Sequence, residues 1–168
     1  MVSTELLRRF PFFAGLNKDQ MNTLAKISDE LTAETNHYFF HEDEELNFVY
    51  LILEGSTAMI FRLPKRNVQH KISEQFSREL VSEDVIVGTL GLGDVFGWSG
   101  LVPPFKATAG AKAITDCKVI AIESRELIKI FEEDYRFGYL MTQKAAQVIR
   151  DRLRDLRIET LAFMAETA

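Results

Sequence analysis

Cysteine is almost absent from this sequence, whose 168 residues contain only Cys117. A single thiol cannot build an internal disulfide framework, a four-thiolate zinc site or the ligand set of an iron–sulfur cluster. The sequence also lacks any apolar run near the ~20 residues that a membrane-spanning helix needs. The region around Arg8 and Arg9 does not have the pattern of a signal peptide. These absences predict a cytoplasmic protein that makes no membrane contact.

Basic residues are not in excess, and the usual catalytic patterns are missing. The chain has 25 acidic and 20 basic residues and a formal charge of −5, which argues against a broad nucleic-acid-binding surface. His37 and His41 have acidic neighbours, but the third histidine, His70, lies in a separate polar segment, so we expect no metal site. Neither a nucleophile elbow nor a metalloprotease helix motif is visible. We therefore expect no catalytic residues, and a jelly-roll enzyme is the least favoured hypothesis.

The apolar residues change their period at two places along the chain. Residues 1–30 have helical spacing, and residues 124–168 return to it. Between them, residues 31–123 are β-branched, aromatic or alternating, which predicts about six to eight short strands. The polar segment from Pro64 to Asp84 is predicted to be an extended hairpin. Residues 1–168 are therefore predicted to form one mainly β domain: a jelly roll (a double-stranded β-helix barrel) with N-terminal helices and a long C-terminal helix.

The last predicted helix, from about Tyr135, carries a stripe that is typical of a coiled coil. The members of the stripe are spaced alternately by four and three residues, as in a heptad seam. They are Thr142, Ala146, Ile149, Leu153, Leu156, Thr160 and Phe163. A second stripe, which contains Phe137 and Met141, is separate and suits docking on the sheet. The seam predicts a homodimer; the alternative is a helix that packs only within its own domain.

The segment from Gly93 to Ala113, GDVFGWSGLVPPFKATAGAKA, contains the most informative loop. It begins like a strand, turns at a glycine into small and apolar residues, breaks at Pro103-Pro104 and resumes as a strand after Lys106. A glycine followed by one helical turn leaves free N–H groups that can bind an anion. An ordinary tight turn without a ligand is the alternative.

Four segments, in order along the chain, resemble the cyclic-nucleotide-binding domain of the catabolite-activator/fumarate-regulator superfamily. They are FPFFAGLNKDQMNTLA, VYLILEGSTAMIF, LGLGDVFG and TDCKVIAIESRELIKIFEED, and the run FGWSGLVPPF is most similar to stand-alone bacterial members. The resemblance implies a regulatory domain that senses a cyclic nucleotide or another small anionic effector, forms a homodimer and signals to a protein partner. Transcription factors of this superfamily carry a winged helix-turn-helix after the dimer helix. Only a few residues follow Phe163 here, so we do not expect DNA binding.

The resemblance also assigns the binding loop residue by residue. It implies that phosphate binds, through backbone N–H groups, at a one-turn helix. That turn comprises Gly97, Trp98, Ser99, Gly100 and Leu101. The family's glutamate, which accepts a ribose hydroxyl, falls on Trp98, whose indole cannot accept such a bond. The family's arginine falls on Ala107, between Lys106 and Thr108, and Lys106 replaces it only if the register shifts by one residue.

Losing these two charged groups should lower the affinity for a cyclic nucleotide. Charge-assisted hydrogen bonds contribute about 1.5–3 kcal/mol each, so losing two weakens binding by roughly 10²–10⁴-fold. Trp98 and Phe105 either close over a different ligand or fill the emptied pocket. We therefore expect a noncatalytic ligand-sensing module with a degenerate phosphate-binding loop. The alternative is a ligand-free scaffold or interaction module whose pocket is plugged by its own aromatic side chains.

Four polar residues predict local backbone geometry. Asn17 and Ser124 are of the types that cap helix N-termini. Asn36 and Asp43 stand where the family has glycines in its early strands. Asn and Asp tolerate the left-handed conformation best after glycine, so we expect both turns to be retained.

Overall fold

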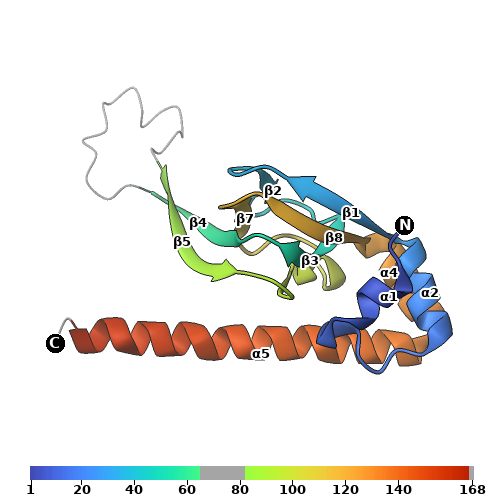
Figure 1. Cartoon of the computed structure of the whole chain (residues 1–168). Coiled ribbons are helices and arrows are strands. Elements are labelled where there is room, and N and C mark those ends of the chain that lie inside the picture. The colour runs from blue at the N-terminus through green and yellow to red at the C-terminus, as the bar shows by residue number, and fades with distance from the viewer. Residues whose placement is uncertain (65–81, 167–168) are drawn as a thin grey trace. The chain divides into compact units, whose positions relative to one another are not determined.

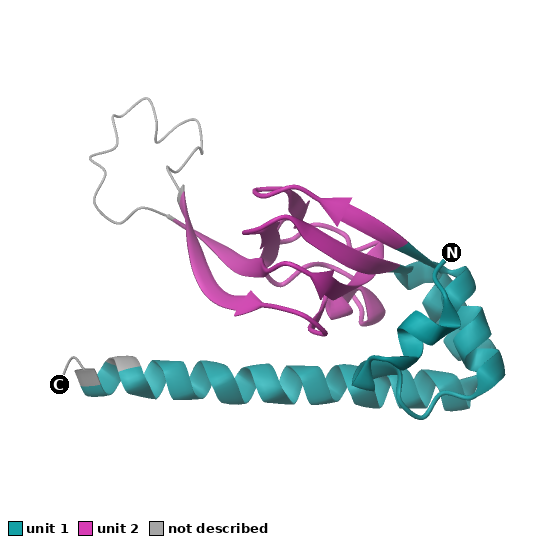
Figure 2. Cartoon of the chain, viewed as in Figure 1, with its two compact units in different colours: residues 1–29, 122–168 teal, residues 30–121 magenta. Residues whose placement is uncertain are grey.

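The computed structural model describes residues 1–64 and 82–166. The tip of the hairpin predicted between Pro64 and Asp84 lies outside this range. The chain divides into two compact units (Figure 2): unit 1 comprises Met1–Asp29 and Ile122–Ala168, and unit 2 comprises Glu30–Ala121. No helix within the described ranges is long and apolar enough to cross a membrane.

The described strands form two four-stranded sheets (Figure 1), with the orders β1-β8-β3-β6 and β2-β7-β4-β5. Strands that are distant in sequence are neighbours in both sheets, as expected of a jelly roll. The predicted mainly β fold with flanking helices is therefore confirmed. The strands are β1 (Ser28–Ala33), β2 (Tyr38–Phe40), β3 (Phe48–Glu54), β4 (Thr57–Pro64), β5 (Ser82–Leu90), β6 (Val95–Phe96), β7 (Gly110–Ala113) and β8 (Cys117–Glu123).

The strands of unit 2 bury one apolar cluster, which we call the roll core. Small residues on β7 accommodate aromatic rings from β2: Ala111 is fully buried and pairs with Phe40 across the two strands. Cys117 is buried in the same cluster, as expected of a packing residue. The members of the roll core are Ala33, Phe40, Leu46, Tyr50, Ile52, Leu90, Phe96, Ala107, Ala111, Ala113, Cys117, Val119 and Ala121.

The two turns at which Asn and Asp replace the family's glycines keep the left-handed conformation. The φ angle is 74° at Asn36 and 64° at Asp43. The Asn36 N–H donates to the carbonyl of Ala113, at 2.8 Å, and the Asp43 N–H donates to the carbonyl of Ala107, at 2.9 Å. The prediction made for these two residues is confirmed, and the second turn is bonded directly to the candidate binding loop.

Unit 1 contains the helices, and its first predicted cap is confirmed. The Asn17 side chain accepts from the Gln20 N–H at 2.9 Å, and the Gln20 side chain accepts from the Asn17 N–H at 3.1 Å, which is a capping box. The helices are α1 (Thr4–Arg8), the one-turn η1 (Pro11–Phe13), α2 (Lys18–Lys26), α4 (Ser124–Glu133) and α5 (Tyr135–Glu166).

The prediction that Ser124 caps the N-terminus of α4 is wrong. The chain passes directly from β8 into α4, so the N-cap is Glu123 and Ser124 is the first helical residue. The Ser124 hydroxyl is buried and has no hydrogen-bond partner among the described residues. At the next helix, Asp134 takes the capping role: its carboxylate accepts from the Phe137 N–H at 2.9 Å and from the Gln20 side chain at 2.8 Å. These bonds lower the Asp134 pKa, the one from Gln20 most.

The long helix α5 has the two stripes that the sequence predicted. Phe137, Met141 and Ala145 are buried, and within unit 1 the helix contacts α4 and η1. Gly138 lies so close to Phe131 of α4 that an added Cβ would be 2.9 Å from the Phe131 Cβ. The seam residues Thr142, Ala146, Ile149, Leu153, Leu156 and Thr160 are all exposed, and the Phe163 side chain lies outside the described part of the chain. The seam thus faces away from the packing within unit 1.

Candidate ligand-binding site

The predicted turn after β6 is present. Gly97 has φ 74° and ψ 11°, and Trp98–Leu101 form a one-turn 3₁₀ helix, η2. The Gly100 N–H donates to the Gly97 carbonyl at 3.0 Å, and the Val102 N–H donates to the Ser99 carbonyl at 3.2 Å. The N–H groups of Trp98 and Ser99 make no hydrogen bond to another described residue. They are the first two donors of the helical turn, the groups that bind anions where a helix N-terminus holds one.

Gly97 is required at this position for two reasons. Its φ lies in the left-handed region that residues with a Cβ rarely adopt. An added Cβ would also lie 2.8 Å from the Phe48 carbonyl oxygen, 3.3 Å from Tyr50 Cδ2 and 3.5 Å from Phe40 Cε1. The turn is therefore pressed against β3 and the roll core, which fixes where η2 begins.

The far side of the loop contains Ala107, at which the resemblance places the family's arginine. Ala107 is 2% exposed and belongs to the roll core. Its N–H donates to the Glu44 carbonyl at 2.8 Å, which holds the segment in register beside residues 43–46. Lys106 and Thr108, on either side, are exposed. The Pro103-Pro104 bond before this segment is cis, and Phe105 has φ 63°.

Aromatic side chains fill the interior next to the turn, and these are not the residues that the sequence suggested. Trp98 and Phe105 are only half-buried. The interior instead holds Tyr50 and Phe96, which pair across β3 and β6 and stack with ring centroids 4.9 Å apart at 15°. Phe39 packs against both rings, at 5.2 Å and 5.1 Å. In the sequence, the aromatic runs HYFF and FVY indicate that aromatic residues are available for the interior. Which of these rings contact each other depends on how the strands pair.

Tyr50 has an unusual environment for a phenol. It is 7% exposed, and its pKa is raised to about 12, mainly because burial disfavours the phenolate and to a lesser degree because Glu44 is negatively charged. The hydroxyl therefore stays protonated at neutral pH. It places one neutral hydrogen-bonding group at the edge of an otherwise apolar interior.

Three kinds of group lie around the turn at η2. The turn offers backbone donors, the interior offers aromatic rings, and Lys106 lies on the exposed side. Within residues 1–64 and 82–166, no group of three or more His, Cys, Asp or Glu side chains is arranged to hold a metal ion. A jelly roll with a one-turn helix between its late strands defines a class of regulatory domains that are generally noncatalytic.

The chain belongs to the cyclic nucleotide-binding domain family. The model of that family matches residues 30–134, which is more than half of the chain. A putative cyclic nucleotide-binding protein from Geobacter metallireducens GS-15 is 25% identical and superposes with a TM-score of 0.73, covering 91% of this chain and 99% of that one. The resemblance stated from the sequence is therefore confirmed.

One further solved structure shares the fold, and one curated protein shares part of the sequence. Catabolite Activator Protein of Thermus thermophilus shares the fold at 19% identity and a TM-score of 0.63, over 91% of this chain and 63% of that one. The human voltage-gated inwardly rectifying potassium channel KCNH6 is 26% identical over 129 residues. That match covers 76% of this chain but 11% of the channel, so the chain spans about a tenth of the channel's length.

Proposed function

We propose that the chain is a noncatalytic regulatory module that binds a small anionic ligand at η2 and passes the signal through α4 and α5 to another protein. The observation that carries this proposal is the pair of unpartnered N–H groups at Trp98 and Ser99, held by a left-handed Gly97. A backbone site of this kind needs no particular side chain, so it is retained when the charged residues around it are replaced.

The ligand in this proposal is held without the family's charged pair. Trp98 stands in place of the glutamate, and the buried methyl group of Ala107 stands in place of the arginine. A cyclic nucleotide would have the backbone donors for its phosphate but neither the guanidinium nor the carboxylate. We therefore expect cyclic nucleotides to bind weakly, and an effector with a compact anionic group and an apolar body to bind better.

The output element of the module is α5. Its seam residues are exposed, and the heptad spacing suits pairing with another helix. A second copy of the chain is the occupant that the spacing alone predicts, and a homodimer would bring two ligand sites under one pair of helices. A change at the roll that moves α4 and α5 would then alter the surface that the pair presents.

A second function, a scaffold without a ligand, is favoured by one observation. Tyr50 and Phe96 stack in the roll core to which Ala107 also belongs, so aromatic rings are packed beside the turn at η2. In that case the turn at η2 binds no ligand, and the module acts only by binding other proteins through its surface.

A thermal-shift panel separates the two functions. The panel contains cyclic AMP, cyclic GMP, linear nucleotides, phosphate, sulfate and small aromatic carboxylates. The first function predicts a saturable rise in Tm with at least one anion, unchanged in Lys106→Ala because Lys106 is on the exposed side. The absence of a rise with every compound supports the scaffold. A rise that Lys106→Ala abolishes would show that the anion depends on the Lys106 ammonium rather than on the backbone donors alone.

A further inference from the structure

The roll core contains one hydroxyl group, on Tyr50, and this hydroxyl has no hydrogen-bond partner within the described part of the chain. The thiol of Cys117, the other polar group of the cluster, contacts the carbonyl oxygens of Ser56 and Thr115, each at 3.2 Å. Buried tyrosines usually find a partner. Solvent reaches the Tyr50 oxygen although the residue is only 7% exposed, so its partner is either water or a ligand.

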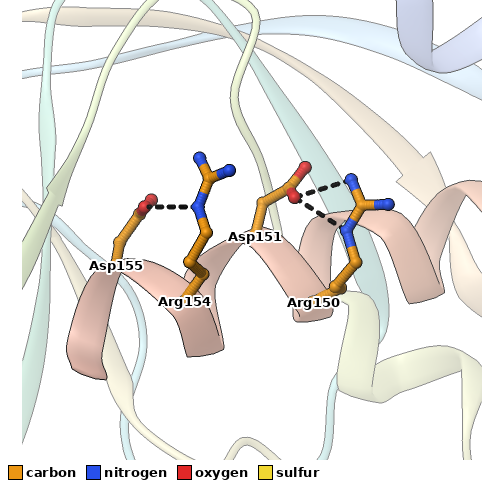
Figure 3. Close-up of polar contacts among 4 residues, drawn as sticks. All are labelled: Arg150, Asp151, Arg154 and Asp155. Atoms are coloured by element: carbon orange, nitrogen blue, oxygen red, sulfur yellow. Dashed lines mark hydrogen bonds and ion pairs between the residues drawn. The ribbon is translucent and has the colours of Figure 1, made fainter. Parts of the chain in front are cut away.

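Elsewhere in the chain, polar side chains use the partners that lie close to them, even where water could take the partner's place. Figure 3 shows this on α5, where Arg150 and Arg154 pair with the residues that follow them, Asp151 and Asp155. Both arginine side chains are 71% exposed, and exposed pairs of this kind contribute little to stability. The Tyr50 hydroxyl is the opposite case, because it is enclosed and nothing in the packing of the described chain satisfies it.

The Tyr50 ring lies against the start of η2. A Cβ added to Gly97 would be 3.3 Å from Tyr50 Cδ2, so the ring touches the turn that presents the N–H groups of Trp98 and Ser99. Four aromatic rings surround it, with centroids 4.9–6.1 Å away, and they belong to Phe39, Phe40, Phe48 and Phe96. These neighbours fix the orientation of the ring, so the hydroxyl is held in place before a ligand arrives.

The other half of the loop is also close to Tyr50. Burial is the main cause of the raised Tyr50 pKa, and the negative charge of Glu44 is the second. Glu44 is therefore near enough to act on the hydroxyl, and its backbone carbonyl accepts from the Ala107 N–H at 2.8 Å. Tyr50 is thus bounded by both halves of the loop, by η2 through Gly97 and by the segment of Ala107 through Glu44.

These surroundings define which ligand group suits the hydroxyl. A phenol that stays protonated at neutral pH keeps its O–H as a hydrogen-bond donor. The carboxylate of Glu44 disfavours a second negative charge beside it. A neutral acceptor, such as a carbonyl oxygen, meets both conditions, whereas the anionic group of the ligand suits the backbone donors of Trp98 and Ser99.

We propose that the Tyr50 hydroxyl determines the specificity of the η2 site by donating a hydrogen bond to a neutral acceptor on the apolar body of the ligand. The ligand class is then an aromatic carboxylate or phosphate that carries a carbonyl group away from its anionic end. This inference rests on the proposed binding of an anion at η2 and adds a second point of contact. Two contacts at a fixed separation distinguish such a ligand from inorganic phosphate or sulfate, which can make only the first.

The test compares matched probes by isothermal titration calorimetry with the whole chain. The probes are meta- and para-acetylbenzoate, which carry a carbonyl group, and the corresponding isopropenylbenzoates, in which a methylene group replaces the carbonyl oxygen and the shape is kept. We expect the wild type to bind at least one acetylbenzoate about 2–12-fold more tightly than its isopropenyl counterpart, the range of one neutral hydrogen bond. Tyr50→Phe, which removes only the hydroxyl, should make the two Kd values of that pair equal.

A matched variant and a measurement without ligand complete the test. Tyr135→Phe makes the same chemical change at a side chain that is 80% exposed, and it should leave the preference for the acetylbenzoate unchanged. Because the Tyr50 hydroxyl has no structural partner, Tyr50→Phe should retain or raise the Tm of the chain without ligand. Circular dichroism checks that both variants keep the fold.

A clear fall in the Tm of Tyr50→Phe without ligand would show that the hydroxyl stabilises the fold, and would overturn the inference. It is also overturned if an anion of the thermal-shift panel binds but the wild type shows no preference for an acetylbenzoate, or if the preference survives in Tyr50→Phe. In these cases the proposed anion site at η2 is unaffected. If neither the panel nor the benzoates bind, the proposed ligand-sensing function fails together with this inference.

Discussion

Replacing Gly97 by alanine tests whether the turn at η2 is held as described. The left-handed conformation at Gly97, with φ 74°, costs an L-residue about 1–2 kcal/mol. The new methyl group would lie 2.8 Å from the Phe48 carbonyl oxygen, which is backbone and cannot rotate away. Some further displacement of η2 or β3 is needed, so we expect a loss of about 2–3 kcal/mol in the free energy of unfolding.

Tryptophan fluorescence is a suitable assay, because Trp98 is the only tryptophan of the chain and directly follows the substituted residue. Its fluorescence during thermal and urea unfolding reports on the turn itself. For a chain of this length, a loss of about 2–3 kcal/mol lowers Tm by about 4–12 °C. Gly91→Ala is the matched control: no atom lies within 4 Å of a Cβ added there, so the expected change is within about 0.5 kcal/mol. If Gly97→Ala and Gly91→Ala have the same stability, the reasoning about this turn is wrong.

Two further predictions concern Tyr50 and Asn36. The Tyr50 pKa is about 12 in the folded chain and 10.0 when unperturbed, so the unfolded state loses its proton first and stability falls as pH rises from about 10 to 12. The loss of unfolding free energy attributable to Tyr50 is about 2 kcal/mol. Urea unfolding at pH 9 and pH 11.5 should therefore show a smaller decrease in the free energy of unfolding for Tyr50→Phe than for the wild type. An equal decrease in the two proteins would refute the burial argument. Asn36 has φ 74°, so Asn36→Gly should retain or slightly raise Tm and Asn36→Ala should lower it by an amount equivalent to about 1 kcal/mol. The opposite order in differential scanning calorimetry would contradict the turn geometry.

Features that depend on the local chain could be predicted from the sequence. The left-handed turns at Asn36 and Asp43, the capping box at Asn17 and the helical turn after Gly97 each follow from residue type within a few positions. The heptad spacing of α5 likewise required only the sequence. The order of four weak segments was enough to identify the family, because the same backbone features recur in it.

Features that depend on which strands meet could not be predicted in the same way. The Tyr50–Phe96 stack exists because β3 pairs with β6 in one particular register. The side on which Lys106 lies was open until the bonds of Ala107 to Asp43 and Glu44 fixed the register of the loop. Ser124 failed as a cap because the end of β8 buries it, and burial is set by tertiary packing rather than by residue type.

The candidate site combines a part made by backbone with a part made by side chains. The part of the site made by backbone is kept, since a glycine and a short helical turn are sufficient for it. The part made by side chains has changed, and the positions that carry charge in the family hold Trp98 and Ala107. The roll core, to which Ala107 belongs, also places aromatic rings beside the turn, and this is why we propose a ligand with an apolar body.

The most direct test is isothermal titration calorimetry with cyclic AMP on the wild type and on the double variant Trp98→Glu, Ala107→Arg. The double variant restores both charged groups next to a turn that is already formed. Because Ala107 is 2% exposed, circular dichroism and thermal unfolding first check that the roll folds with an arginine there, and Trp98→Glu alone, at a half-buried position, is a second variant. We expect the folded double variant to bind cyclic AMP roughly 10²–10⁴-fold more tightly than the wild type, and Trp98→Glu alone roughly 10–10²-fold more tightly. Equal affinities in the wild type and in both folded variants would contradict the proposed loss of the charged pair.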